Sequence, residues 1–96
     1  MSMLDTIRAK RDELYEVARK FNVEGLYVFG SCARGEETPE SDIDFLVQFS
    51  PRSRFGDHVE LSDAFNTLFG RKVDVVSARG LSPYIGKLIW KDAVAV

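Results

Sequence analysis

The sequence predicts an α/β (α+β) fold: one small domain over residues 1–96, with a mixed sheet of three to four strands and flanking helices. Three observations predict it. A long helical pattern opens the chain, and short runs of strong β-formers then alternate with helical patterns. The composition, 45% hydrophobic and 29% charged residues, is that of a folded globular chain. A chain of this length is expected to bury about 60–65% of its unfolded surface, which suits a single domain.

The first element is expected to be a helix over about 3–21, with Ser2 as its N-cap. Its apolar residues recur at helical spacing, with charged residues between them: Leu4, Ile7, Leu14, Ala18 and Phe21. The core-side position in the middle of this face is Arg11, whose long stem can pack while its charged end stays in water. Asn22 and Gly25 are expected to end the helix.

Two strands are expected next, and a turn-rich stretch separates them. Residues 26–29 form a short buried strand that Gly30 and Ser31 interrupt. After a turn or a short helix, residues 42–49 form a second strand, which Ser50 and Pro51 close.

A helix, a third strand and a last helix complete the expected order α-β-β-α-β-α. Five apolar residues lie on one face of the middle helix, and Gly70 follows as its C-terminal stop: Leu61, Ala64, Phe65, Leu68 and Phe69. Residues 73–76 form the third strand. Ser82 is the N-cap of the last helix, and Pro83 is its first residue.

Charge and cysteine content exclude several classes of protein. The formal charge is −2 and the isoelectric point about 5.3, so a direct nucleic-acid-binding role, which needs a basic excess, is not expected. Cys32 is the single cysteine, so there is no internal disulfide and no cysteine zinc cluster. No apolar run approaches the roughly 20 residues of a membrane span. The charged N-terminus does not resemble a signal peptide, and we expect a cytoplasmic protein without membrane contact.

Three carboxylates are candidates for a metal site. Asp42 and Asp44 stand two apart at the start of a strand and therefore point to the same face, an arrangement that suits Mg²⁺. Asp74 lies in an apolar strand, where an ionised carboxylate is costly without a cation or hydrogen-bond donors. If the second and third strands are neighbours, the three carboxylates converge. An isolated pair of this kind is more often a turn or cap, so these residues alone do not decide the function.

The turn at Gly30 and Ser31 adds a candidate phosphate-binding element. A strand that ends in Gly-Ser and turns into a helical segment presents backbone N–H groups and a hydroxyl to an anion. A phosphate-binding turn together with a metal-binding carboxylate set predicts a site for a nucleoside triphosphate and its magnesium.

The motif resembles a known family. Gly30-Ser31, ten intervening residues and then Asp42-x-Asp44 resemble the signature of the polymerase-beta-type nucleotidyltransferases. The string YVFGSCARGEETPESDIDFLVQF resembles the minimal nucleotidyltransferase (MNT) branch, and RKVDVVS places Asp74 at the third carboxylate position. The resemblance covers effectively the whole chain and implies the polymerase-beta-like nucleotidyltransferase fold.

The resemblance implies a mechanism that uses two Mg²⁺ ions and ATP. Asp42 and Asp44 match the residues that bridge the metals, and Asp74 matches the ligand on the nucleophile side, which can accept the hydroxyl proton. Gly30 and Ser31 match the residues that hold the terminal phosphates. Attack at the α-phosphorus then gives an AMP-acceptor product and pyrophosphate.

Arg34 and Lys87 have two interpretations each. Arg34 binds phosphate or an acidic partner surface, or it forms a structural ion pair that holds its loop. Lys87 is better interpreted as a solvated helix charge than as a triphosphate ligand. His58 has no neighbour in sequence that suggests a base or a metal ligand, and Cys32 is best interpreted as a small filler behind the turn.

The resemblance also implies a partner. Small MNT proteins are typically antitoxins that adenylylate a tyrosine of a HEPN ribonuclease toxin, so we expect a cognate HEPN toxin and a hetero-oligomer. Larger family members carry a further helical domain over the acceptor pocket, and here a second polypeptide would cover the site. The apolar residues near Trp90 and in the final AVAV suggest an interface.

Alternatives stay open at this point. One is a small-molecule adenylyltransferase that works as a homodimer. Another is a non-catalytic antitoxin or binding module, although a scaffold has no need of costly clustered carboxylates. Self-modification of Tyr15, Tyr27 or Tyr84 is a minor alternative.

Overall fold

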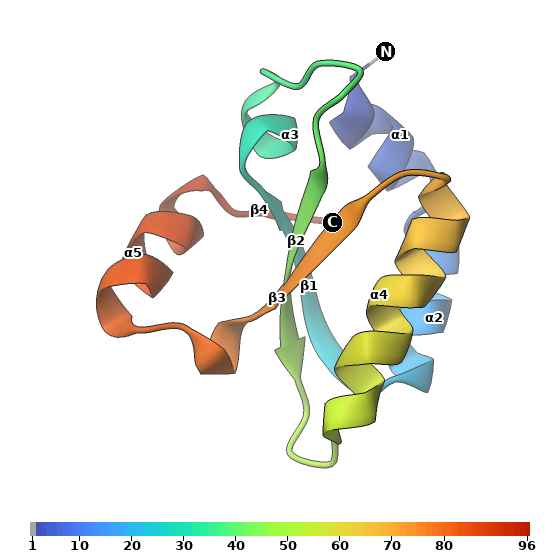
Figure 1. Cartoon of the computed structure of the whole chain (residues 1–96), viewed down its shortest axis with the longest axis vertical. Helices are drawn as coiled ribbons and strands as arrows, with labels where there is room; N and C mark the ends of the chain where they lie inside the picture. Colours follow the sequence, from blue (N-terminus) through green and yellow to red (C-terminus); the bar gives the residue numbers. More distant parts are fainter. Residues whose placement is uncertain (1) are drawn as a thin grey trace.

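The computed structural model describes residues 2–96, which form a four-stranded sheet with helices on both faces (Figure 1). The strand order is β3-β2-β1-β4; β1 is antiparallel to both neighbours, whereas β2 and β3 are parallel. The strand bounds are Val23–Phe29 for β1, Ile43–Phe49 for β2, Val73–Ser77 for β3 and Val94–Ala95 for β4. The predicted mixed sheet and α+β class are confirmed.

The N-terminal helical region is two helices and not the single helix expected over 3–21. α1 spans Met3–Ala9 and α2 spans Arg11–Lys20, with a break at Lys10. Ser2 caps α1 as predicted, because its side chain accepts a hydrogen bond from the Asp5 backbone N–H at 3.2 Å. The break places Arg11 at the surface, where its guanidinium lies 5.1 Å from the centre of the Tyr15 ring and not on the core side.

Gly25 lies inside β1 and does not end the preceding helix, so that expectation is wrong. The chain turns at Asn22, whose φ of 63° is left-handed, and β1 begins at the next residue. The register with β2 shifts between Val23 and Gly25. A Cβ at position 25 would meet the end of the exposed, flexible Gln48 side chain, so this glycine allows a close approach within the sheet and does not mark a helix end.

The remaining helices follow the predicted order. α3, the short helix after the first strand, spans Ser31–Arg34, and α4 spans Phe55–Phe69 and ends at left-handed Gly70. A single 3-10 turn, η1 (Ala78–Gly80), precedes α5 (Pro83–Asp92). Ser82 caps α5 by accepting a hydrogen bond from the Ile85 N–H at 3.2 Å. The end of α4 at Gly70 and the start of α5 at Ser82 are therefore encoded locally, as the sequence predicted.

The core lies mainly between the sheet and the layer formed by α1, α2 and α4, while α5 covers the other face (Figure 1). Phe45 of β2 centres this layer, with its ring 5.0 Å from Phe65 and 5.9 Å from Phe69. Leu46 is the next residue along the strand, points to the opposite face and is also fully buried. The centre of the sheet is thus apolar on both faces, so a polar site is expected at the ends of the strands.

The final AVAV segment closes the sheet, so it does not form the exposed interface that we expected. Val94 and Ala95 pair with β1, and the side chain of Val96 is 8% exposed. Arg11 and the Tyr15 hydroxyl each donate a hydrogen bond to the Val96 carbonyl at 3.3 Å. The segment packs because β1 would otherwise present an unpaired edge.

Candidate active site

Asp44 and Asp74 are direct neighbours across the two parallel strands. Each is the second residue of its strand, and the parallel register pairs them. Register partners point to the same face of a sheet, here the face that carries α5. The Asp74 carboxyl lies within hydrogen-bonding reach of Asp44. The fold therefore brings two acidic side chains from distant parts of the sequence into contact.

Burial raises the pKa of the Asp44 carboxyl above its ordinary value of 3.8. The negative charges of Asp74 and Asp42 raise this pKa further, and so does the hydrogen bond with Asp74; the Lys72 ammonium acts in the opposite direction. Two neighbouring carboxylates in a partly desolvated position repel each other, so this arrangement costs stability in the absence of a cation.

Gly30 brings backbone directly against the Asp44 carboxylate. It follows β1 with φ 75° and ψ −152°, a conformation that side-chain-bearing residues avoid. A Cβ at position 30 would lie 2.6 Å from Oδ2 of Asp44. Only glycine therefore fits between the end of β1 and the carboxylate.

Ser31 begins α3 immediately beside this contact. The N–H groups of Ala33 and Arg34 bond back to the Gly30 carbonyl at 3.1 and 3.2 Å, which closes the turn. The first N–H groups of a helix have no partner within that helix, so Ser31 contributes a hydroxyl and a donor-rich backbone next to Asp44. Gly30, Ser31, Asp44 and Asp74 are thus brought together at one end of the sheet.

Asp42 is on the same side of the strand but is turned to a different partner. Its carboxylate lies 3.4 Å from Nζ of Lys72, and both side chains are substantially exposed. Within residues 2–96, no three His, Cys, Asp or Glu side chains are close enough together to form a preformed metal site. Of the three carboxylates expected to converge, Asp44 and Asp74 are therefore in contact, whereas the Asp42 carboxylate is paired with Lys72 and acts on Asp44 through its charge.

Arg34 forms ion pairs in this structure. Its Nη1 lies 2.6 Å from Oδ2 of Asp92 in α5, and its Nε lies 3.1 Å from Oε1 of Glu36. Of the two interpretations of Arg34, the structural ion pair is the one that is formed; phosphate binding stays a prediction. The pair links α3, which begins at the Gly30–Ser31 turn, to the end of α5.

Sequence reasoning missed Lys72 and the structural role of His58. Lys72 stands two residues before Asp74, so strand alternation could have placed it on the same face. His58 has no such signal: its Nε2 is 2.8 Å from the Val75 carbonyl, and its ring lies 5.6 Å from that of Phe49. Cys32 is 1% exposed and its pKa is raised by burial, as suits a filler.

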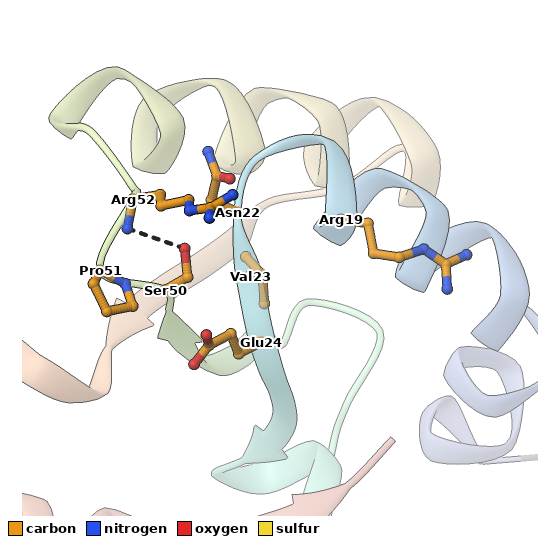
Figure 2. A pocket seen from close by; sticks show the side chains of 7 residues that line it. All are labelled: Arg19, Asn22, Val23, Glu24, Ser50, Pro51 and Arg52. Carbon is orange, nitrogen blue, oxygen red and sulfur yellow. Dashed lines mark hydrogen bonds between the residues drawn. The ribbon is translucent and has the colours of Figure 1, made fainter.

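A surface cavity of about 450 Å³ lies at the opposite end of the sheet, where β1 begins and β2 ends (Figure 2). Arg19, Asn22 and Arg52 line it, and the Arg52 N–H donates to the Ser50 hydroxyl at 3.2 Å. None of the residues predicted for the nucleotide site line this cavity. The cavity is therefore separate from the Gly30–Ser31 turn and the acidic pair.

Across residues 2–96, no helix has the length and apolar character needed to cross a membrane.

The fold and the site define a class of protein. The family model described as "Polymerase beta, Nucleotidyltransferase" matches residues 12–95. The chain belongs to this nucleotidyltransferase family, and it is a nucleotidyltransferase.

Several of its curated relatives are named as protein adenylyltransferases. A candidate protein adenylyltransferase of Methanocaldococcus jannaschii is 38% identical over 80 residues, which is 80% of each chain. The protein adenylyltransferase MntA of Thermococcus cleftensis is 35% identical over 81 residues, which cover 84% of this chain and 82% of the relative.

Solved structures agree on the fold. A candidate minimal nucleotidyltransferase superimposes with a TM-score of 0.88 at 36% identity, covering 100% of this chain and 97% of the other. The complex of a tri-AMPylated Shewanella oneidensis HEPN toxin with an MNT antitoxin gives a TM-score of 0.69 at 18% identity. That match covers 92% of this chain and 69% of the other, and at this identity it supports the fold alone.

Proposed function

We propose that this nucleotidyltransferase transfers AMP from ATP to a tyrosine hydroxyl of a HEPN-type ribonuclease toxin and so neutralises the toxin. The observation that carries the proposal is the contact of Asp44 with Asp74 beside the Gly30 backbone. The names of the curated relatives support a protein acceptor. The structural neighbour that contains an AMPylated HEPN toxin supports the kind of acceptor.

The acidic cluster fits a divalent cation. Asp44 and Asp74 are half-buried like charges whose proximity raises the pKa of Asp44, and a hard cation would relieve that repulsion. In this proposal Asp42, Asp44 and Asp74 would hold two Mg²⁺ ions, and the ion at Asp42 would take the place of the Lys72 ammonium. When bound, magnesium supplies charge neutralisation of the triphosphate and lowers the pKa of the attacking hydroxyl.

The other residues bind and orient ATP. The Ser31 hydroxyl and the backbone of the Gly30 turn hold the terminal phosphates, and Arg34 approaches them when it leaves Asp92. Asp74 accepts the tyrosine proton as the phenolic oxygen bonds to the α-phosphorus. The bond between that phosphorus and pyrophosphate breaks in the same step. Catalysis then rests on positioning and charge neutralisation.

The test is to incubate the purified chain with Mg²⁺, ATP and a cognate HEPN toxin, and then to measure the toxin's intact mass and ribonuclease activity. We expect a mass gain of one or more AMP units with loss of ribonuclease activity, and neither with the Asp42→Ala/Asp44→Ala variant. If that variant neutralises the toxin as well as the wild type does, the protein is a non-catalytic antitoxin and the proposal fails.

A further inference from the structure

The outer side of α5 exposes large apolar side chains. Tyr84 is 74% exposed, Leu88 52% and Ile85 46%. Leu88 follows Ile85 by three residues and Tyr84 by four, and side chains at these spacings are neighbours on a helix, so the three form one apolar surface. The inner side of α5 packs on the sheet, with the Trp90 ring 4.8 Å from that of Tyr27 in a T-shaped contact. The outer side of α5 therefore presents large apolar side chains to solvent.

The charge beside this surface is positive, unlike that of the chain as a whole. Lys87 and Lys91 are exposed on α5 and lie three residues after Tyr84 and Leu88, respectively. The one acidic residue of α5, Asp92, is paired with Arg34. The whole chain carries a net charge of −2, so its negative charge lies elsewhere. A complementary partner would present apolar side chains flanked by carboxylates.

This surface is also tied to the candidate active site. α5 covers the sheet face on which Asp44 and Asp74 lie, and the 2.6 Å Arg34–Asp92 ion pair joins α5 to the helix that starts at the Gly30–Ser31 turn. A macromolecule that brings a hydroxyl to Asp74 must approach this face. α5 is then the adjacent element with an apolar area to bury.

We propose that the α5 surface, made of Tyr84, Ile85, Leu88, Lys87 and Lys91, is the docking surface for the protein acceptor. It binds an apolar patch bordered by Asp and Glu side chains on that acceptor. The inference rests on the proposed function in one respect, that the acceptor is a protein. It adds which surface selects the acceptor and by what chemistry.

The test is calorimetric binding of the HEPN toxin to the purified chain without ATP. Leu88→Asp, which places a charge in the centre of the surface, is expected to weaken binding at least tenfold. Lys91→Glu is expected to weaken it severalfold, with a larger effect at low salt. Both positions are exposed, so melting temperature and affinity for a non-hydrolysable ATP analogue should match the wild type.

Two control variants match these changes elsewhere on the surface. Val59→Asp alters a side chain on α4 that is 50% exposed, close to the value for Leu88. Arg19→Glu reverses an exposed charge beside the cavity in Figure 2. Each control should change the affinity for the toxin less than twofold.

Several results would overturn the docking proposal. One is that Leu88→Asp binds the toxin with wild-type affinity, and another is that Val59→Asp loses as much affinity as Leu88→Asp. The proposal also fails if the wild-type chain does not bind the toxin, or if the chain forms a homodimer that Leu88→Asp dissociates. A different result is that the toxin binds through α5 but receives no AMP. In that case the docking surface stands and the proposed function fails.

Discussion

Asp44 and Asp74 are neighbours across the two parallel strands, β2 and β3. The backbone of Gly30, at the end of antiparallel β1, lies against the Asp44 carboxylate. This contact is costly in isolation, because burial and like charge raise the pKa of Asp44. A pair that lowers stability is expected where function requires it. Substitutions at Asp44 can therefore separate its effect on stability from its effect on activity.

Asp44→Asn is expected to abolish AMP transfer while raising the melting temperature at pH 7. The amide removes one charge of the repelling pair and can still hydrogen-bond to Asp74. Thermal unfolding without metal, alongside a label-transfer assay, measures both effects. A variant that is less stable than the wild type at pH 7 would show that the carboxylate pair is not under electrostatic strain.

The stability gain of Asp44→Asn should depend on pH. Because the pKa of Asp44 is raised in the folded state, this group favours folding fully below its unfolded value of 3.8. That contribution is lost as the pH rises through the raised pKa. The difference in melting temperature between Asp44→Asn and the wild type should therefore be small near pH 4 and largest at neutral pH. A constant difference across this range would contradict the raised pKa.

Gly30→Ala is expected to abolish nucleotide binding, and Gly35→Ala is its matched control. Both glycines have positive φ, 75° and 72°; at Gly35, which is left-handed helical, alanine costs about 1–2 kcal/mol, and at Gly30, with ψ −152°, it costs more. Only position 30 has a neighbour in the way, Oδ2 of Asp44 at 2.6 Å, whereas nothing lies within 4 Å at position 35. Calorimetry with a non-hydrolysable ATP analogue should show lost binding in Gly30→Ala only. Equal binding by the two variants would remove Gly30 from the site.

Lys72→Ala is expected to tighten Mg²⁺ binding, by less than about fivefold. The Lys72 ammonium competes with the ion for Asp42, but an exposed ion pair is worth at most about 1 kcal/mol. The shift of melting temperature with Mg²⁺ concentration, compared in Lys72→Ala and the wild type, measures the change. Weaker Mg²⁺ binding in the variant would mean that Lys72 supports the site and does not compete for it.

Substitutions of Arg34 and of Asp92 are expected to have different effects on the affinity for nucleotide. Arg34→Ala is expected to lower affinity for the ATP analogue severalfold, since it removes a phosphate-binding guanidinium. Asp92→Ala should leave the affinity equal or higher, because it releases Arg34 from the 2.6 Å ion pair. Unchanged affinity in both variants, with equal small losses of stability, would leave Arg34 a purely structural role.

The sequence predicted the elements whose ends are encoded locally. Ser2 and Ser82 cap helices as expected, and Gly70 ends α4 in a left-handed conformation. The break at Lys10 and the start of β1 before Gly25 were not predictable in this way. Both depend on how the helices pack across the sheet and on the register of β1 with β2, which are tertiary properties.

The candidate site was predictable in its residue types but not in its contacts. Spacing and alternation place Asp42 and Asp44 on one face, and the adjacency of Asp74 required the parallel pairing of β2 with β3. The ion pairs of Asp42 with Lys72 and of Arg34 with Asp92 carry no comparable signal. The second of these joins residues 58 positions apart, and such partners are chosen only when the chain folds.

Transfer of a nucleotidyl group from this site to a protein is measured most directly with two labels. The chain, Mg²⁺ and the HEPN toxin are incubated in parallel with ATP labelled at the α-phosphate and at the γ-phosphate, and label on the toxin is counted. We predict that α-label joins the toxin, that γ-label leaves with pyrophosphate, and that Asp44→Asn transfers neither. Label from the γ-phosphate on the toxin, or α-label transfer that survives Asp44→Asn, would contradict nucleotidyl transfer by this site.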